Sequence, residues 1–488
     1  MKKFAGPLLT MLMLTALPAA AHAQNDAKPA AAPARPPLPA NWVLPANAKI
    51  AELIDARIAQ RPGEGIAVGV LDRSGRRIVA RGPGGKAAPF GDRTVFEIGS
   101  MSKIFTALLL ADMVVKGEVS LDDPAEKYLP AGAKMPERNG RKITLRDLSN
   151  QHSGLPRLPS NMPFGNPEDP YSDYTEKMML DFLAGYELTR DIGSQFEYSN
   201  LGVGLLGYLL GRAGHSDYET MIARRITGPL GMRDTAITLS SDQKARFAQG
   251  HDAYMRPTGA WSLPTLAGTG ALRSTITDML IFVSAALDPK SPIGPAMKLA
   301  TAERWPLGAP GRAIGLGWII SEVDKGRETL FHNGGTGGFR AAMLLEPARG
   351  SAVVVLTNAS VEPSSDDLAS HILLGTPLQP LVPVPPAPPP STQAKRTEVT
   401  LPPAELDRVV GRYELAPGVA INVAREGAGL TAQLTGQPAF PIFAEAPLNF
   451  FLRVADAQLR FVAGPDGKVT GVALVQAGQQ QEAKRIAP

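Results

Sequence analysis

The stretch "FEIGSMSKIFTALLL", residues 96–110, places a serine and a lysine three positions apart at the start of a long apolar run. Apolar residues on all sides of the expected helix predict that this helix is buried. Ser100 and Lys103 then share one helix face, one turn apart. Burial disfavours a charged ammonium, so the pKa of Lys103 is expected to fall. The amine is therefore a candidate base for the Ser100 hydroxyl.

The pattern Ser-x-x-Lys is weak by itself, because it also describes many ordinary helix starts. The chain contains it a second time, from Ser241 to Lys244 in "LSSDQKARF", where polar neighbours predict a solvated helix start without function. The same interpretation is open for Ser100 and Lys103, so the catalytic hypothesis needs partners elsewhere in the chain.

A second motif lies in "QFEYSNLGVGLLGYLLG", residues 195–211, where Tyr198 and Asn200 directly precede an apolar helical run. A tyrosinate beside a lysine ammonium can serve as a general base. The Asn200 side chain can donate to a substrate carbonyl and accept from Lys103. The alternative interpretation is an aromatic residue next to an asparagine helix cap.

A third motif lies in "FHNGGTGGFRAAMLL", residues 331–345, where His332 and Gly334 precede further glycines and an expected strand. Glycine-rich backbone at a sheet edge lets the main chain of a substrate pair with N–H groups. The alternative is a flexible approach to a hairpin. A second His-x-Gly, from His152 to Gly154, has no strand after it and predicts a structural turn.

The body of the chain, residues 46–376, mixes helices and strands. Residues 48–60 have helical spacing, and residues 65–82 read as two strands around a glycine-containing turn. Residues 339–358 form a second expected hairpin, and the region from about Lys103 to Leu287 is mostly helical. Strands at both ends with helices between them predict an α+β fold whose sheet is assembled from distant parts of the chain.

A proline-rich stretch divides this body from the tail. Eight prolines lie between Pro377 and Pro390, so residues 377–400 are expected to form a stiff extended linker. Residues 401–488 contain short, roughly alternating runs, many of them separated by Gly, Pro or Asp. This spacing predicts a small antiparallel barrel or sandwich.

The chain begins with a pattern typical of export. Residues 1–23 contain two lysines, an apolar run and a small-x-small ending, which predicts a secretory signal peptide cut before Gln24. The alternative, an uncleaved anchor, is disfavoured by the short apolar run, and no later stretch is long and apolar enough to span a bilayer. Residues 24–45 form an Ala/Pro-rich lead-in. The expected location is therefore periplasmic or secreted.

Composition excludes several classes of function. The 488 residues carry a formal charge of +4, and removal of two signal-peptide lysines leaves 4 − 2 = +2, without the basic run typical of a nucleic-acid interface. The chain has no cysteine, so thiol catalysis and cysteine-bound zinc are excluded. The six histidines are scattered without ligand spacing, so no metal and no cofactor are expected.

The three motifs, in this order and with their flanking sequences, resemble class C β-lactamases and their relatives. These relatives include D-Ala-D-Ala carboxypeptidases, D-aminopeptidases and family VIII esterases. The resemblance covers about residues 50–375. It implies a β-lactamase/transpeptidase-like antiparallel sheet flanked by helices, plus an all-helical region. The tail resembles, more loosely, the small β-barrel domains appended to some members of the family.

The resemblance also implies a role for each motif residue. Ser100 is the nucleophile, and Lys103 and Tyr198 form the base system that activates it. The N–H groups of Ser100 and Gly335 form the oxyanion hole. Which of Lys103 and Tyr198 accepts the proton stays open, because the two groups titrate together. The implied substrate-binding residues are Asn200, His332, Gly334 and Gly335.

One position departs from the family pattern. The third motif of true β-lactamases begins with lysine, whereas this chain has His332, and histidine is mostly neutral near pH 7. The difference weakens the case for efficient β-lactam hydrolysis, although Arg340 could supply a cation instead. Residues 157–178, between the first two motifs, are either a roof of the cleft that sets specificity or a surface loop.

The sequence therefore predicts an exported serine hydrolase that cleaves amide bonds through an acyl-enzyme on Ser100. Its expected substrates are peptides, D-amino-acid peptides or β-lactam-like compounds, including cell-wall fragments. No nucleic-acid partner and no membrane span after signal cleavage are expected. Three alternatives stay open: an esterase for small acyl esters, a true β-lactamase, and a slow-turnover penicillin-binding or sensor protein.

Overall fold

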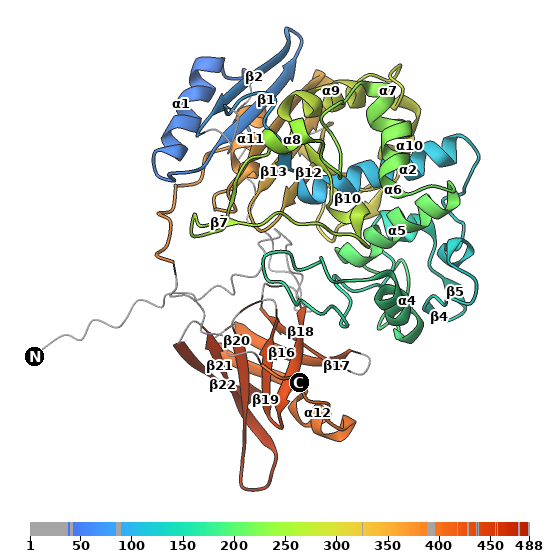
Figure 1. Ribbon diagram of the computed structural model, residues 1–488, viewed down its shortest axis with the longest axis vertical. Helices are drawn as coiled ribbons and strands as arrows, with labels where there is room; N and C mark the ends of the chain where they lie inside the picture. Colours follow the sequence, from blue (N-terminus) through green and yellow to red (C-terminus); the bar gives the residue numbers. More distant parts are fainter. Residues whose placement is uncertain are drawn as a thin grey trace, which may run out of the picture.

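The computed structural model shows a large mixed body with a separate barrel beside it (Figure 1). The expected signal peptide, residues 1–23, and most of the lead-in lie outside the described residues. The described residues are 38–39, 42–83, 89–324, 326–387, 396–416, 418–426, 429–435, 437, 439–453, 455, 457–476 and 479–486. None of the helices in these ranges has the length and apolar character needed to cross a bilayer.

In the described part of the body, a sheet of eight strands runs in the order β2-β1-β14-β13-β12-β11-β10-β9, with antiparallel neighbours throughout. The strands are β1 (Ile66–Asp72), β2 (Gly75–Arg81), β9 (Trp305–Pro306), β10 (Arg312–Ile314), β11 (Ile319–Asp324), β12 (Arg327–Gly335), β13 (Arg340–Glu346) and β14 (Ser351–Thr357). The first hairpin pairs with the last strand, where Ile66 lies opposite Thr357. The predicted α+β fold, whose sheet joins both ends of the body, is confirmed.

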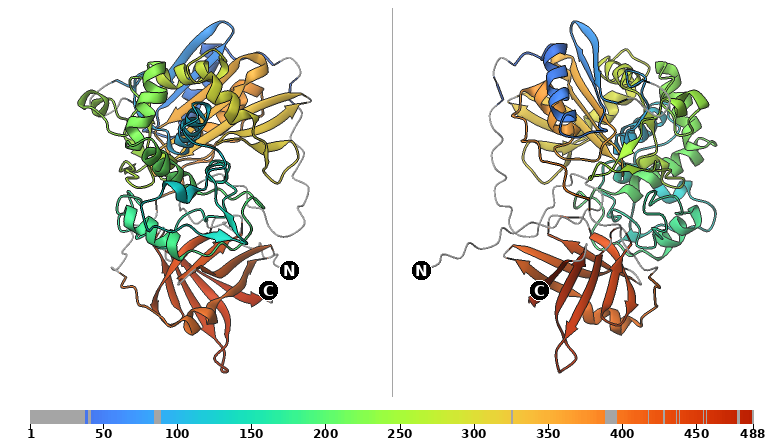
Figure 2. Two further views of the ribbon diagram at one scale, coloured as in Figure 1. Left: turned by 90° about the vertical axis from the view of Figure 1, so that its right-hand side faces the viewer. Right: turned by 60° about the vertical axis from the view of Figure 1, so that its left-hand side comes forward.

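Helices cover both faces of this sheet (Figures 1 and 2). The covering helices are α1 (Asn47–Ile58), α2 (Ser102–Val115), α9 (Ile276–Leu287) and α11 (Ser365–Leu374). On β14, Val353 packs with the core formed by α1 and α11, whereas Val354 packs with the core that contains α2 and α9. Alternate side chains of one strand therefore fill two cores, which explains why β13 and β14 are apolar runs rather than alternating ones.

The remaining helices of the body form the predicted helical region beside the sheet (Figure 1). They are α3 (Leu145–Ser149), α4 (Glu176–Gly185), α5 (Asn200–Ala213), α6 (Tyr218–Ile222), α7 (Gly228–Leu230), α8 (Ser241–Ala245) and α10 (Gly294–Ala302). Short strand pairs join β3 (Phe96–Glu97) to β8 (Arg273–Ser274), β4 (Glu137–Arg138) to β5 (Arg141–Lys142), and β6 (Gly250–His251) to β7 (Pro257–Thr258). Single helical turns include η1 (Gly99–Met101) and η4 (Ala267–Thr269).

The tail is a closed antiparallel barrel, as predicted. Within its described residues, eight strands follow in chain order and β15 pairs with β22 to close the ring. The strands are β15 (Gly411–Ala416), β16 (Val419–Glu426), β17 (Gly429–Leu434), β18 (Ala439–Ala446), β19 (Asn449–Leu452), β20 (Ala457–Ala463), β21 (Val469–Gln476) and β22 (Gln479–Ile486). One element was not expected from the sequence, the short helix α12 (Pro403–Val409). The Tyr413 hydroxyl donates a hydrogen bond to Val409 O at the end of this helix, at 2.7 Å.

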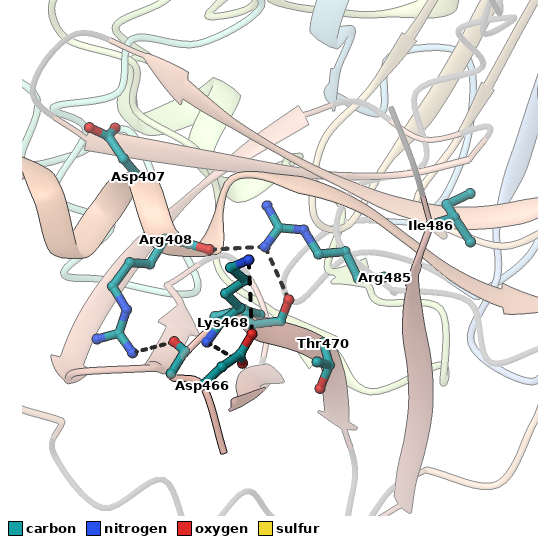
Figure 3. Close-up of a pocket in the computed structure, with 9 residues that line it drawn as sticks. Asp407, Arg408, Asp466, Lys468, Thr470, Arg485 and Ile486 are labelled. Carbon is teal, nitrogen blue, oxygen red and sulfur yellow. Dashed lines mark hydrogen bonds and ion pairs between the residues drawn. The ribbon is translucent and has the colours of Figure 1, made fainter. Parts of the chain in front are cut away.

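A hollow of about 640 Å³ lies on the barrel, between α12, the turn before β21 and the end of β22 (Figure 3). The two arginine side chains that line this hollow donate hydrogen bonds to backbone carbonyls of the barrel domain. The Arg485 guanidinium donates to Arg408 O at 3.4 Å and to Val469 O at 3.1 Å. The Arg408 guanidinium donates to Gly467 O at 3.1 Å. None of the motif residues lines this hollow, and its polar contacts stabilise the barrel.

The barrel contacts the body beside residues 157–178 (Figure 2). Arg453 Nη1 of the barrel donates to Pro163 O at 3.0 Å, and the same side chain pairs with Glu398 at 2.6 Å. Val399 N donates to Ala444 O at 2.9 Å, so contacts with the barrel begin inside the expected linker. The barrel therefore lies against the segment that was expected either to roof the cleft or to form a surface loop.

An electrostatic interaction between two like charges crosses the same boundary. One carboxylate oxygen of Glu426, on β16, is buried and has no hydrogen-bond partner among the described residues. The pKa of Glu426 is raised to about 7, chiefly by burial and also by the charge of Glu197 in the body. The folded protein therefore binds this proton more tightly than the unfolded chain does, so stability falls as pH rises from about 4.5 to about 7.

We expect Glu426→Gln to raise the melting temperature at pH 8 by about 2–4 °C. The neutral amide replaces a buried carboxylate that is mostly ionised at pH 8 and mostly protonated at pH 5 in the folded protein, so the difference from wild type should be several-fold smaller at pH 5. Thermal unfolding at both pH values measures this. Glu414→Gln, on an exposed position of β15, is the matched control. An equal shift at both pH values would contradict the assignment to ionisation.

Candidate active site

Ser100 and Lys103 meet at the N-terminal end of α2. Strand β3 ends at Glu97, the turn η1 carries Ser100, and α2 begins at Ser102. Lys103 is only 1% exposed, and its Nζ lies 3.0 Å from Ser100 Oγ. Ser100 itself is half-buried, so a substrate can reach its hydroxyl. The predicted buried helix is present, and Lys103 lies one turn from Ser100 as expected, although Ser100 itself belongs to the turn η1 that precedes the helix.

The other contacts of Lys103 decide the direction of its hydrogen bond to Ser100. Nζ lies 2.9 Å from Asn200 Oδ1 and 2.8 Å from Thr269 O, and both oxygens can only accept. Burial lowers the pKa of Lys103 well below its usual value, and the charge of Arg157 lowers it further. A neutral amine donates its two hydrogens to these oxygens and turns its lone pair toward the Ser100 hydroxyl. This arrangement can accept the serine proton.

Asn200 has a defined orientation at the start of α5. Its Nδ2 donates to the Tyr171 hydroxyl at 2.9 Å, while its Oδ1 accepts from Lys103 and from Thr269 Oγ1 at 3.2 Å. The preceding Ser199 caps the helix. The alternative interpretation of Asn200 as a helix cap is therefore wrong, because Ser199 fills that position and Asn200 contacts Lys103.

Tyr198 lies above Lys103, with Nζ 4.7 Å from the centre of its ring. Burial raises the pKa of Tyr198 to about 12, although a hydrogen bond with Ser100 acts in the opposite direction. The phenol is therefore neutral near pH 7. When Lys103 is neutral, a form that its lowered pKa favours, the pair holds one acceptor, the amine, and one donor, the phenol.

His332 lies on β12, beside Tyr198 and Lys103, and is buried below the surface of the site. The side chain is 2% exposed, and the centre of its ring lies 6.4 Å from that of Tyr198. Nδ1 lies 2.6 Å from Asn333 O, which can only accept, so Nδ1 carries the hydrogen. Burial, followed by the neighbouring Lys103, lowers the pKa of His332 to about 4. His332 is therefore uncharged near pH 7.

Arg340 does not supply a cation to this site. In the β12–β13 register it lies opposite Gly335, and opposed residues share a sheet face. Asn333, on that same face, donates to Asp366 of α11 at 2.6 Å, so the face is turned toward α11. The Arg340 guanidinium donates to Thr336 O and Phe339 O, both at 3.0 Å. The suggestion that Arg340 replaces the lysine of the third motif is therefore wrong.

Glycines let β12 approach the serine turn. A Cβ on Gly334 would lie 1.9 Å from Ile98 O and 3.1 Å from Ser100 N. A Cβ on Gly99, whose φ is +49°, would lie 2.6 Å from Gly335 N. The backbone of Ser100 and that of Gly335 are therefore neighbours, as an oxyanion hole formed by their N–H groups requires.

We expect Gly334→Ala to lower kcat/KM by about 100-fold or more, because the methyl group forces β12 away from the serine turn and displaces a donor of the oxyanion hole. Steady-state kinetics and thermal unfolding measure the effect. Gly91→Ala is the control, because its added Cβ meets nothing within 4 Å. Wild-type turnover in Gly334→Ala would show that this close approach is not needed.

The repeated motif fragments lie elsewhere, as predicted. Ser241 and Lys244 are exposed on α8, which Ser240 caps with Gln243. His152 lies in a turn, where its Nδ1 is 2.7 Å from Asn150 O. All motif residues singled out in the sequence, by contrast, gather around Ser100.

Three further residues join the group although sequence reasoning did not assign them. Thr269 lies on η4 within "GTGALRSTITDM", a stretch whose similarity to the family was its only signal. Tyr171 and Arg157 belong to the Pro/Asn/Gly-rich segment of residues 157–178. Tyr171 is 3% exposed and packs on Trp261, with ring centres 5.4 Å apart. This segment therefore forms part of the wall of the site.

Within the described ranges, no group of three or more His, Asp or Glu side chains could hold a metal ion. The site consists of a serine, a buried amine, a phenol and backbone donors.

The fold and this group of residues define a serine hydrolase that acts on amide bonds. The chain belongs to the β-lactamase family, because residues 50–376 match the family model described as Beta-lactamase. Residues 395–485 match a domain of unknown function, DUF3471.

Curated relatives agree with this assignment. The D-alanyl-D-alanine-carboxypeptidase/endopeptidase AmpH of Escherichia coli is 33% identical over 316 residues, which cover 60% of this chain and 80% of AmpH. Penicillin-binding protein 4* of Bacillus subtilis is 26% identical over 422 residues, 81% of this chain and 89% of that protein. A solved structure, the β-lactamase/D-alanine carboxypeptidase from Yersinia pestis, has a TM-score of 0.57 at 23% identity, over 68% of this chain and 97% of that one.

Proposed function

We propose that the chain is an exported serine peptidase that cleaves amide bonds in D-amino-acid peptides through an acyl-enzyme on Ser100. The observation that carries the proposal is the Lys103 amine, 3.0 Å from Ser100 Oγ, whose other two contacts are acceptors. Such an amine takes the serine proton when Oγ attacks a carbonyl carbon.

The acylation step follows from these positions. Oγ forms a bond to the carbonyl carbon while its proton passes to Lys103, and the N–H groups of Ser100 and Gly335 stabilise the oxyanion. The C–N bond then breaks. The leaving nitrogen takes a proton from the Tyr198 hydroxyl, and the Lys103 ammonium restores that proton. In deacylation, Lys103 takes a proton from water, and the resulting hydroxide attacks the ester carbon. The bond between this carbon and Ser100 Oγ then breaks, and Oγ takes the proton back from Lys103.

The substrate class and the location rest on two kinds of support. Relatives that are similar in sequence carry the names D-alanyl-D-alanine-carboxypeptidase/endopeptidase and penicillin-binding protein. The small-x-small ending after the apolar run of residues 1–23 supports export to the periplasm or beyond.

Ester hydrolysis is the second candidate function. His332 is uncharged near pH 7, so the third motif does not demand a negatively charged substrate. The same acyl-enzyme chemistry cleaves esters, whose leaving groups need less protonation than an amine. β-Lactam hydrolysis and slow-turnover penicillin binding use the same first step and differ in the rate of deacylation.

Intact-mass spectrometry after brief exposure to benzylpenicillin separates these functions. A persistent adduct favours a penicillin-binding peptidase or sensor. Consumption of the drug without an adduct means β-lactamase turnover, which would contradict the argument from His332. If the drug is untouched, hydrolysis of D-aminoacyl amides and small esters is measured next, and inactivity toward all of them would overturn the proposal.

A further inference from the structure

The segment that forms the wall of the site places an arginine beside the reacting groups. Arg157 O accepts from Asn200 N at 2.9 Å and from Leu201 N at 3.3 Å, so its backbone is held against the start of α5. The carbon of its guanidinium lies 5.2 Å from the centre of the Tyr198 ring. Its charge also acts on Lys103 and Tyr171. The cation therefore faces the group around Ser100.

This cation has no counter-charge of its own. Within the described ranges, the Arg157 guanidinium forms no ion pair and no hydrogen bond, and the side chain is half-buried. The acidic neighbour whose charge it feels, Glu197, forms an ion pair with Arg190 instead. A guanidinium carries five donors and stays charged at every pH that proteins tolerate. Its donors are therefore available to a ligand.

The other basic groups near the serine cannot take this role. Lys103 is buried and all its contacts are to the site itself. His332 is buried and uncharged near pH 7. Arg340 is buried on the α11 face of the sheet, where it donates to backbone carbonyls while its Nε and Nη2 have no hydrogen-bond partner among the described residues. Its neighbouring charges are Glu362 and Asp366 on that face. Among the described residues around Ser100, Arg157 is the half-buried arginine whose unused donors a ligand can reach.

We propose that Arg157 binds a free carboxylate of the substrate, on the leaving-group side of the scissile bond. The inference rests on the proposed function and narrows it to substrates that end in a carboxylate, such as peptides cleaved next to their C-terminus. Tyr198, which gives its proton to the leaving nitrogen, lies under the guanidinium, so a group held by Arg157 is adjacent to that nitrogen. A planar guanidinium binds a carboxylate through two parallel hydrogen bonds, which also orient the substrate.

The test compares matched substrates that differ only in this charge. One pair is a D-alanyl-D-alanine peptide with a free C-terminal carboxylate and the same peptide as its amide. The other pair is a thioester whose leaving group ends in a carboxylate and the methyl ester of that compound. We expect the wild type to prefer the carboxylate form of each pair that it cleaves. Arg157→Gln should raise KM for that form about 10–100-fold, with a smaller change in kcat and no change for the neutral form.

Two further variants make the test specific. Arg157→Lys keeps the charge without the fork and should restore part of the preference. Arg412→Gln, at an exposed position on β15, should leave both substrates unaffected. An equal loss on charged and neutral substrates would mean that Arg157 only supports Tyr198, and the inference would be overturned.

Failure of the inference differs from failure of the proposed function. Cleavage of thioesters but of neither peptide would contradict the peptidase assignment, and the thioester pair would still measure the carboxylate preference. A wild type that does not distinguish carboxylate from neutral forms overturns the role of Arg157, whichever bond it cleaves.

Discussion

Ser100→Ala is expected to lower kcat/KM by about 10⁴-fold or more and to remove every covalent adduct with acylating compounds. Methyl replaces the oxygen that forms the acyl-enzyme, so no residual chemistry can pass through residue 100. The remaining machinery contributes only binding and the oxyanion hole. Stability should change little, because Ser100 is half-buried and its hydroxyl contacts only the site groups Lys103 and Tyr198.

The measurement combines steady-state turnover, intact mass and thermal unfolding on the full chain. Ser241→Ala is the matched control, since Ser241 begins the other Ser-x-x-Lys pattern but is exposed on α8. It should behave as wild type in all three measurements. Substantial turnover in a well-folded Ser100→Ala variant would reject the acyl-enzyme mechanism for this protein.

We expect Lys103→Arg to lower kcat/KM by about 10²–10⁴-fold, because a guanidinium stays protonated and cannot accept the serine proton. The wild-type amine works as a base only when it is neutral. Burial lowers the pKa of Lys103 well below its usual value, so the neutral form is favoured at a lower pH than for an exposed lysine. The acidic limb of the kcat/KM profile should therefore report the protonation of this amine.

The pH profile distinguishes loss of the base from loss of structure. In Lys103→Met, which removes the amine without adding a buried charge, residual activity should lose the acidic limb, whereas a merely damaged site would keep it at lower activity. Lys244→Arg, on the exposed face of α8, should leave rate and profile unchanged. An unaltered acidic limb in Lys103→Met would assign the base to another group, with Tyr198 as the next to test.

These predictions bear on the third motif as well. In the family pattern, the lysine of the third motif places a positive charge on the strand that corresponds to β12. In this chain His332 is neutral, and a carboxylate-binding Arg157 would supply the positive charge from the segment that precedes α5. Arg453 of the barrel contacts that segment at Pro163 O, so the tail could affect substrate binding without contributing a reacting group.

Local patterns in the sequence were sufficient for much of this protein. The apolar run after Ser100 predicted a buried helix, because a helix surrounded by a core must be apolar on all sides. Alternation with a period of two predicted the strands of the tail, because one face of each strand fills the barrel. The three motifs marked Ser100, Tyr198 and His332, because their order and flanking sequences resemble those of the family.

Helix α12 escaped prediction because it is short, and a few residues after two prolines carry no measurable periodicity. Thr269 accepts from Lys103 through its backbone carbonyl, which every residue has, so the similarity of its stretch to the family was the one signal that it lies in the site.

Other properties depend on contacts between distant segments. The protonation of Lys103 and Tyr198 depends on how deeply both are buried and on which acceptors surround the amine. The direction of Arg340 depends on strand register, because a shift of one residue turns each side chain to the opposite face. The charge at residue 157 reaches Tyr198 only because its backbone is bonded to α5. The residue types and their order could thus be read along the chain, whereas proton positions and available charges arise only where separate segments pack together.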